Sequence, residues 1–441
     1  MTRQTKSPIA RWSAALTVGV VAIAAGCGDP FSVSDPSRYT DEALDAALDA
    51  VANGAEGQFH LALDEYVIYT GLLGDELMHT GTWTGYEDLS NGTARYATPG
   101  TNTYTDGLMN SLLRARYATQ DAEARFTRLA VADADPKMVQ VKSTEGWIDL
   151  YLGEGFCEVP SGQGTATVSD QQLYLQAITE LKGALTLAQQ ANLTPWVNYD
   201  RAGIARAYLL AGGLATQAGN ASYDSAAAYA RQVPDGFIKY ADFSTNSGAQ
   251  NNAVVQLETV GYNKAAGMRP KWWPMVDTIE SKLRDPWTGQ LDPRVQIKHP
   301  AGSLGVDGRT PHYSQWKYQT LGDDIPITKS EEMRLIEAEV AWRGNDLTAA
   351  VSIMNALRAK VGLGALPDPA GDASTVLQYL LSERFATMFM EGRRLADLYR
   401  FHLVASELAA GRLEKFPISQ FEAQNNSNVG DVISQRCAPI S

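Results

Sequence analysis

Two stretches of the chain combine aromatic rings with planar polar side chains and lack helical periodicity. The first is residues 79–107, rich in Gly, Thr and Asn, and the second lies within residues 237–327. An aromatic plane covers the apolar face of a sugar ring, while amide and guanidinium groups bond its hydroxyls. The candidate ligand-binding residues are Trp83, Tyr86, Asn91, Arg95, Trp287, Tyr313 and Trp316. Core or loop packing is the alternative for each ring taken singly, and we expect Trp272 and Trp273 to fill the core.

The sequence carries no recognisable catalytic motif. Its five His are scattered, and neither His-Glu-x-x-His, Gly-x-Ser-x-Gly nor a phosphate-binding loop occurs. Carboxylates are plentiful, so a glycosidase pair stays open as a hypothesis. The acidic turn Asp368–Asp372 lacks the spacing of an EF-hand. We therefore predict a binding protein with no catalytic residue, metal or cofactor.

The N-terminus has the layout of an export signal. Three basic residues precede a short apolar run, and residues 1–26 end in Ala-Ala-Gly directly before Cys27. Small residues before a Cys resemble a lipobox, which predicts lipidation of Cys27 and attachment to a membrane by the lipid alone. Residues 27–39 are then a tether. An ordinary signal peptide with an incidental Cys is the alternative.

Net charge and the remaining cysteines narrow the partners and the compartment. The 441-residue chain has a net charge of −13, which becomes −16 without the three basic residues of the leader. Such a charge disfavours nucleic acid and direct docking on anionic lipid. Cys157 and Cys437 could form one disulfide in an oxidising compartment. Two buried free thiols are the alternative.

Helical periodicity covers most of the remaining chain. We divide it into a helical region, 40–236, and a C-terminal region, 237–441, whose first part, 237–327, is irregular. The expected helices span residues 40–51, 58–73, 108–131, 136–153, 170–191, 199–218, 223–233, 330–343 and 347–361. A strand is expected at 252–259. Several helix pairs with small residues and Gly-Asn turns resemble tetratricopeptide-like units.

Charged and apolar residues alternate in the C-terminal stretch Leu377–Phe401. Two apolar stripes at helical spacing meet at Gly392, which predicts a helix–turn–helix. So many charges beside apolar surface must pair with one another or with the backbone. We therefore predict a structural ion network here.

The same stretch resembles the closing signature of the SusD/RagB family. The matching residues are Glu383, Arg384, Phe389, Glu391, Gly392, Arg394, Asp397, Leu398 and Arg400. Further resemblances follow the family's order: Asp292-Pro293-Arg294, the helix with Arg334 and Glu337-Ala338-Glu339, the pattern Asn355, Arg358 and Gly362, and Phe416-Pro417-Ile418. Ser419 replaces a Pro of the family pattern.

This resemblance implies a mostly α-helical SusD-like fold, with tetratricopeptide-like helix pairs beside an irregular, loop-rich ligand-binding region. It implies an outer-membrane lipoprotein, exposed at the cell surface, that binds oligosaccharide or another nutrient. Its implied partner is a SusC-like TonB-dependent β-barrel transporter. In relatives the ligand surface is built from an early loop and the irregular insertion, which correspond in position to the two aromatic stretches. A tetratricopeptide-like protein-interaction scaffold is the main alternative, and a glycan-processing enzyme the second.

Overall fold

The structure is a computed structural model that describes residues 40–93, 103–162, 164–213, 220–259 and 262–429. Residues from 48 onward belong to one compact unit, and α2 (Asp41–Asp45) belongs to a separate small one. Thr40 caps α2 as predicted, because its Oγ1 accepts a hydrogen bond from the N–H of Ala43 at 3.2 Å. Within the described ranges, no helix has the length and apolar character needed to span a bilayer.

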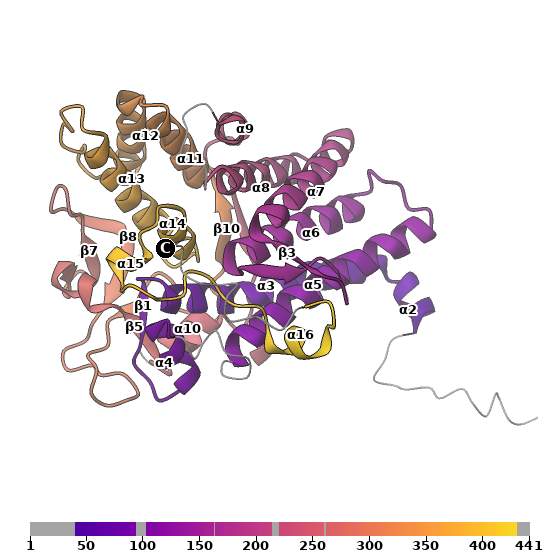
Figure 1. Cartoon of the computed structure of the whole chain (residues 1–441), viewed down its shortest axis with the longest axis horizontal. Helices are drawn as coiled ribbons and strands as arrows, with labels where there is room; N and C mark the ends of the chain where they lie inside the picture. Colours follow the sequence, from indigo (N-terminus) through magenta and orange to yellow (C-terminus); the bar gives the residue numbers. More distant parts are fainter. Residues whose placement is uncertain (1–39, 94–102, 163, 214–219, 260–261, 430–441) are drawn as a thin grey trace, which may run out of the picture. The chain divides into compact units, whose positions relative to one another are not determined.

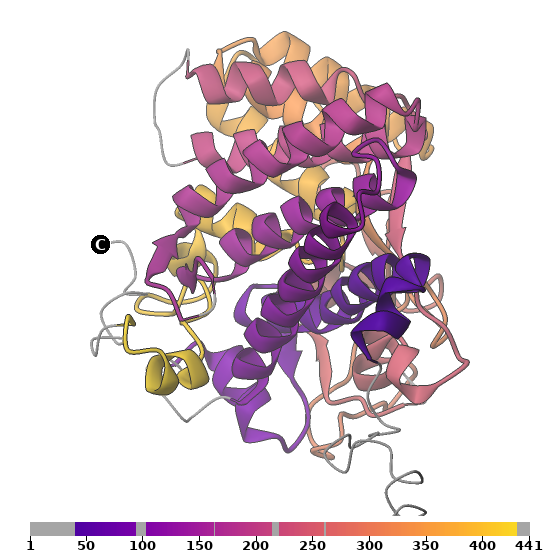
Figure 2. The ribbon, with the colours of Figure 1, turned by 90° about the vertical axis from the view of Figure 1, so that its right-hand side faces the viewer.

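Nine helices of the large unit pack in one continuous row (Figure 1). In order they are α3 (Leu48–Leu73), α5 (Thr103–Arg128), α6 (Pro136–Gly155), α7 (Asp170–Gln190), α8 (Thr194–Gly212), α9 (Ala221–Ala230), α11 (Ser330–Arg343), α12 (Leu347–Lys360) and α13 (Ala373–Thr387). Each helix packs against the next, so α9 contacts α11 across the whole irregular insertion. Helix pairs that are far apart in the sequence are therefore neighbours in space (Figure 2).

Small residues allow the helices of this row to approach closely. A Cβ on Gly146 of α6 would lie 2.6 Å from Leu181 Cγ, and one on Gly203 of α8 would lie 2.7 Å from Leu181 Cδ1. Leu181 of α7 thus fits between two glycines on the flanking helices. The start of α7 is fixed by a capping box between Ser169 and Gln172.

The irregular insertion consists of short strands and turns. Its elements are β4 (Ile238–Ala241), η3 (Gly248–Gln250), α10 (Ala253–Glu258), β5 (Ala266–Met268), η4 (Pro270–Met275), β6 (Val276–Asp277), β7 (Lys282–Arg284), β8 (Leu291–Lys298), β9 (Ser314–Gln315) and β10 (Ile325–Lys329). Strands β6 to β9 form one four-stranded sheet, and β4 pairs with β10. One apolar core contains residues from both sides of position 237. The boundary predicted there does not divide the core.

Three local predictions are wrong. Residues 252–259 form helix α10 and not a strand, because the Asn252 side chain caps it by accepting from the N–H of Val255 at 3.3 Å. The stretch 79–107 contains a helix, α4 (Thr84–Asn91). The helix expected over 40–51 ends at Asp45, and α3 begins at Leu48 and runs unbroken to Leu73.

Asp292-Pro293-Arg294 lies inside strand β8 and does not form a separate turn. The register between β7 and β8 shifts here: Lys282 pairs with Gln296, while Leu283 pairs with Asp292. A bulge of this kind accommodates proline, which has no N–H to give to the ladder.

The C-terminal helix–turn–helix is confirmed. Helix α13 ends at Thr387, Gly392 has φ +74°, and α14 (Arg394–Arg400) follows. A Cβ on Gly392 would lie 3.0 Å from the ring of Tyr66, so space as well as backbone conformation requires glycine. The chain continues through α15 (Val404–Glu407) and α16 (Gln420–Asn425).

Candidate functional site

Pairing of two short strands joins the early loop to the irregular insertion. Strand β1 (Leu77–His79) pairs antiparallel with β5, with Leu77 opposite Met268. On the far side of β5, the N–H of Met268 donates to the carbonyl of Tyr313 at 2.8 Å. The two aromatic stretches predicted from the sequence therefore meet around β5.

Trp83 occupies the cap position at the start of α4. Its side chain is 37% exposed, and its backbone N–H donates to Nε2 of His79 at 3.2 Å. Burial lowers the pKa of His79, although Glu87 and Asp307 oppose this, so the imidazole stays neutral and can accept that bond. An exposed tryptophan is thus held on an ordered backbone.

Tyr86 supports Trp83 from below. Tyr86 is only 1% exposed, and its ring lies 5.3 Å from that of Trp83 at an interplanar angle of 87°. Further edge contacts link Tyr86 to Tyr69 at 5.9 Å and to Tyr104 at 4.8 Å. We assign Tyr86 a positioning role, because its ring is enclosed by other aromatic rings.

A loop of the insertion extends the surface around Trp83. The N–H of Asp307 donates to the carbonyl of Thr80 at 3.1 Å, so the loop carrying the exposed Val306 lies against the chain that leads into Trp83. A Cβ on Gly305 would lie 2.2 Å from the Thr80 oxygen, so only glycine permits this approach. We call Trp83, Val306 and Asp307 the Trp83 surface.

Tyr313 does not offer a free ring face. Its ring stacks on Trp273 at 4.8 Å and 13°, and on His299 at 3.9 Å and 6°. Two rings this close and this parallel must cover opposite faces of Tyr313. Trp316, half-buried, has Lys298 Nζ at 3.8 Å from its ring centre, which covers one face.

Trp287 lies in a different place. It lines a cavity of about 330 Å³ together with Trp272, and its ring meets Tyr379 of α13 edge-on at 4.6 Å and 80°. Trp272 stacks on Phe385 at 4.2 Å and 8°, whereas the adjacent Trp273 stacks on Tyr313. The two tryptophans of η4 thus pack on different sides. Trp287 and Tyr313, which the sequence analysis placed in the same candidate site, contact different aromatic residues.

Of the remaining predicted residues, two lie within the described ranges and three lie outside them. Asn91 is exposed in the last turn of α4, while Arg95, Cys27 and Cys437 lie outside the described residues. Cys157 is disulfide-bonded. Its pairing with Cys437 stays a prediction.

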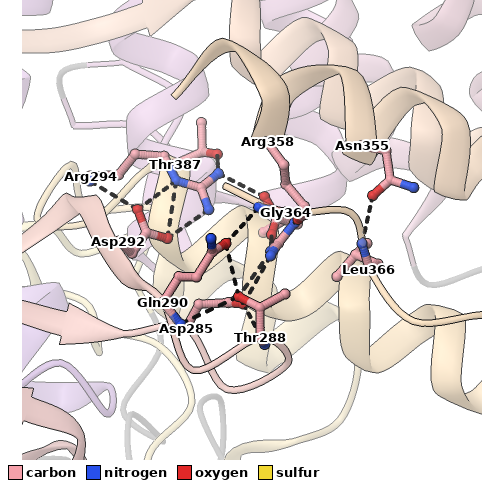
Figure 3. A network of polar contacts seen from close by, with 11 residues as sticks. Asp285, Thr288, Gln290, Asp292, Arg294, Asn355, Arg358, Gly364, Leu366 and Thr387 are labelled. Carbon is pink, nitrogen blue, oxygen red and sulfur yellow. Dashed lines mark hydrogen bonds and ion pairs between the residues drawn. The ribbon is translucent and has the colours of Figure 1, made fainter. Parts of the chain in front are cut away.

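The most recognisable motif residues form a buried ion network (Figure 3). Glu383 of α13 accepts from Arg294 Nη1 at 2.7 Å and from Arg358 Nη1 at 2.6 Å. Arg358 also donates to Asp285 at 2.8 Å, and Arg294 to Asp292 at 2.7 Å. These contacts tie β8, the loop after β7 and α12 to α13, which confirms the predicted structural network.

A second network joins the C-terminal motif to α11. Arg400 donates to Glu339 at 2.7 Å and to Asp397 at 2.9 Å, and Arg384 donates to Asp397 at 2.8 Å. Burial alone would raise the pKa of Glu339, but the charges of Arg400 and Arg343 overcome it and lower the pKa to about 2. These carboxylates are held ionised by arginines, which is a structural and not a catalytic arrangement. Among the described residues, no three His, Cys, Asp or Glu side chains are placed to hold a metal ion.

Sequence reasoning missed Val306 and His299, and it assigned Trp273 to the core. Val306 is not aromatic and so gave no signal in the sequence; the hydrogen bond from the N–H of Asp307 to the carbonyl of Thr80 holds its loop against the chain that leads into Trp83. Trp273 and His299 become significant only through their stacking on Tyr313.

The fold is shared with solved structures of the SusD superfamily. A SusD superfamily protein from Bacteroides vulgatus matches with a TM-score of 0.65 at 15% identity, covering 88% of this chain and 98% of the other. One from Bacteroides thetaiotaomicron matches with a TM-score of 0.64 at 16% identity, covering 87% and 97%. A laminarin binding SusD-like protein matches with a TM-score of 0.57 at 15% identity, covering 86% and 98%. No curated protein sequence matches the chain.

Part of the sequence also matches a family model. Residues 305–435 match the SusD family model, and this span contains the C-terminal motif whose residues form the networks described above. The chain thus has a C-terminal segment that matches the SusD family model, and it has the fold of SusD superfamily structures.

Proposed function

We propose that this protein is a lipid-anchored nutrient-binding protein of the outer membrane, facing the cell surface. It captures oligosaccharide at the Trp83 surface and delivers it to a SusC-like TonB-dependent transporter. The observation that carries the proposal is the exposed ring of Trp83, seated on buried Tyr86 at the junction of the early loop and the insertion. Two matched proteins are described as carbohydrate binding and as laminarin binding, which supports the ligand class.

The geometry favours capture without chemical change. An ordered aromatic platform binds a sugar face without first losing conformational freedom. Asp307 lies next to the platform, and the pKa of its carboxyl is lowered: burial would raise it, but hydrogen bonds from Thr310 and Arg309 outweigh burial. Asp307 therefore stays ionised and can accept hydrogen bonds from sugar hydroxyls. With a chain charge of −13, a neutral glycan is a better ligand than an acidic one.

The ligand test compares two exposed aromatic residues. Trp83→Ala should weaken binding of a neutral hexasaccharide such as laminarihexaose, and should remove the fluorescence change that binding causes. Tyr240→Ala is the matched control, because Tyr240 is similarly exposed but lies on β4. Equal affinity in the Trp83 variant and the wild type, across a panel of neutral glycans, would overturn the assignment of the ligand surface.

The partner test uses the full-length protein extracted in mild detergent. A TonB-dependent barrel recovered in near-equal amount would support delivery to a transporter. Recovery without any barrel would contradict it and would favour the scaffold alternative. Trp83→Ala separates the two functions further, because nutrient capture predicts lost uptake with an intact complex.

A further inference from the structure

Residues of α5, the β2–β3 hairpin and α16 line a groove. The ribbons of these three elements lie near one another (Figures 1 and 2). Strands β2 (Glu158–Pro160) and β3 (Thr167–Ser169) form the hairpin. The groove encloses about 940 Å³, nearly three times the volume of the cavity at Trp287. Its size is that of a site for an extended small ligand.

Two aromatic side chains stand in this groove with most of their surface in solvent. Tyr117 of α5 is 63% exposed and Phe421 of α16 is 61% exposed. Neither ring contacts another aromatic ring in the described part of the chain. Exposed aromatics that share a concave surface indicate a binding site more often than isolated ones do.

The polar side chains of the groove can bond hydroxyl groups. Asn110 and Arg114 line it one helical turn apart on α5, and Gln120 follows. Gln120 donates through Nε2 to Glu145 at 2.9 Å, which leaves its carbonyl oxygen for a donor. Arg114 interacts electrostatically with Glu65, but no hydrogen bond joins its guanidinium to another described residue, so its N–H groups can donate to a ligand.

The charges that line the groove balance. Arg114 and Arg116 face Glu65 and Glu422, two of each sign. Arg116 is paired with Asp149 at 3.0 Å, which leaves the other lining charges with an excess of at most one negative charge. A neutral ligand with hydroxyl groups therefore suits this surface better than an anion.

The groove is separate from the Trp83 surface. Tyr104, which touches Tyr86 beneath Trp83, lies near the start of α5. Tyr117 is 13 residues further along the same helix, which corresponds to about 20 Å at the rise of an α-helix.

We propose that the groove at Tyr117 and Phe421 is a second binding site, which takes a neutral oligosaccharide. The sugar rings stack on the two aromatic side chains, and Asn110, Arg114 and Gln120 bond the hydroxyls. The proposal rests on the proposed function only for the class of ligand. With this site the protein contacts either one glycan at two places or two separate glycans.

The test combines two readouts that separate the sites. The probes are laminarihexaose, maltohexaose and xylohexaose, titrated into the whole protein. Calorimetry counts all sites, whereas tryptophan fluorescence reports the Trp83 surface, because the described residues that line the groove include no tryptophan. We expect the double variant Tyr117→Ala/Phe421→Ala to lose one class of sites, or roughly tenfold in affinity, with the fluorescence change retained. Tyr117→Phe keeps the ring and should bind like the wild type.

Each outcome decides one proposal. Wild-type binding by the double variant overturns the groove site and leaves the Trp83 surface standing. Binding that survives Trp83→Ala but is lost in the double variant supports the groove and overturns the Trp83 surface. Failure of all three probes to bind overturns both. If the double variant instead loses a protein partner and no glycan, the groove is a protein contact and the proposal is wrong.

Discussion

Glu383 and Arg358 are joined by a 2.6 Å hydrogen bond in the interior, although they come from different helices of the C-terminal region. Arg294 binds the other oxygen of Glu383 at 2.7 Å. The Glu383 carboxylate thus bridges two guanidinium groups, which also pair with Asp285 and Asp292, and fixes α12 and β8 against α13. Replacement of Glu383 removes two charge-assisted hydrogen bonds, while Asp285 and Asp292 still neutralise the two guanidinium groups.

Glu383→Gln should therefore destabilise the protein by about 1–3 kcal/mol, because Arg294 and Arg358 each exchange a charge-assisted hydrogen bond for a weaker one. Urea unfolding measures the change. Glu280→Gln is the control, since Glu280 is exposed and lies 3.9 Å from Lys282, so its loss should cost less than about 0.5 kcal/mol. Equal stability of the two variants would show that the network contributes little.

Glu76 should make the stability of the protein fall as pH rises, whereas a carboxylate in an ion pair makes stability rise with pH. Burial raises the pKa of Glu76 to about 7, although the N–H of Met390 donates to its carboxylate at 2.9 Å. The folded state then keeps a proton that the unfolded state has released, so this group lowers stability as pH rises from about 4.5 to about 7.

Glu76→Gln keeps an acceptor for Met390 and removes the buried charge. We expect the variant to match the wild type at about pH 4.5 and to exceed it by about 3 kcal/mol at about pH 8. Urea unfolding at both pH values gives the difference, in which contributions of other carboxylates cancel. A gain that is the same at both pH values would contradict the assigned protonation.

The fold was largely predictable because its helices carry strong local signals. The capping box at Ser169, the Asp135 cap before Pro136 and the two apolar stripes around Gly392 each mark an element boundary within a few residues. The ion network was predictable in kind, since buried charges must pair. Its partners were not: Arg358 and Asp285 are 73 positions apart, and only the tertiary fold brings them together.

The site was predictable only in part. Trp83 is exposed as a platform must be, but burial of Tyr86 and the stacking of Tyr313 depend on neighbours that the sequence does not reveal. Trp287 shares composition and sequence region with Tyr313, yet it packs against Tyr379 of α13. Tyr117 was missed, because it lies within a regular helix, where an aromatic residue is expected to face the core.

Gly305 should control the Trp83 surface. Gly305→Ala would place a Cβ 2.2 Å from the carbonyl oxygen of Thr80, so the loop must move away and Val306 with it. We expect weaker glycan binding and a loss of about 1–3 kcal/mol of stability. Gly248→Ala is the control, since no atom lies within 4 Å of the added Cβ. Unchanged glycan affinity in the Gly305 variant would separate this loop from the ligand surface.

The close packing of the helices predicts that alanine substitutions at two glycines change the stability of the protein in opposite directions. Gly203→Ala on α8 would bring a Cβ to 2.7 Å from Leu181 and 2.9 Å from the Trp147 ring, in a core that cannot expand. The overpacking should cost about 1–3 kcal/mol, more than the gain in helix propensity. Gly183→Ala on α7 meets no atom within 4 Å and should stabilise the protein by up to about 1 kcal/mol. Urea unfolding of both variants tests the contact between α7 and α8 directly. If both substitutions stabilised the protein, the helices would not be packed as closely as the structure places them.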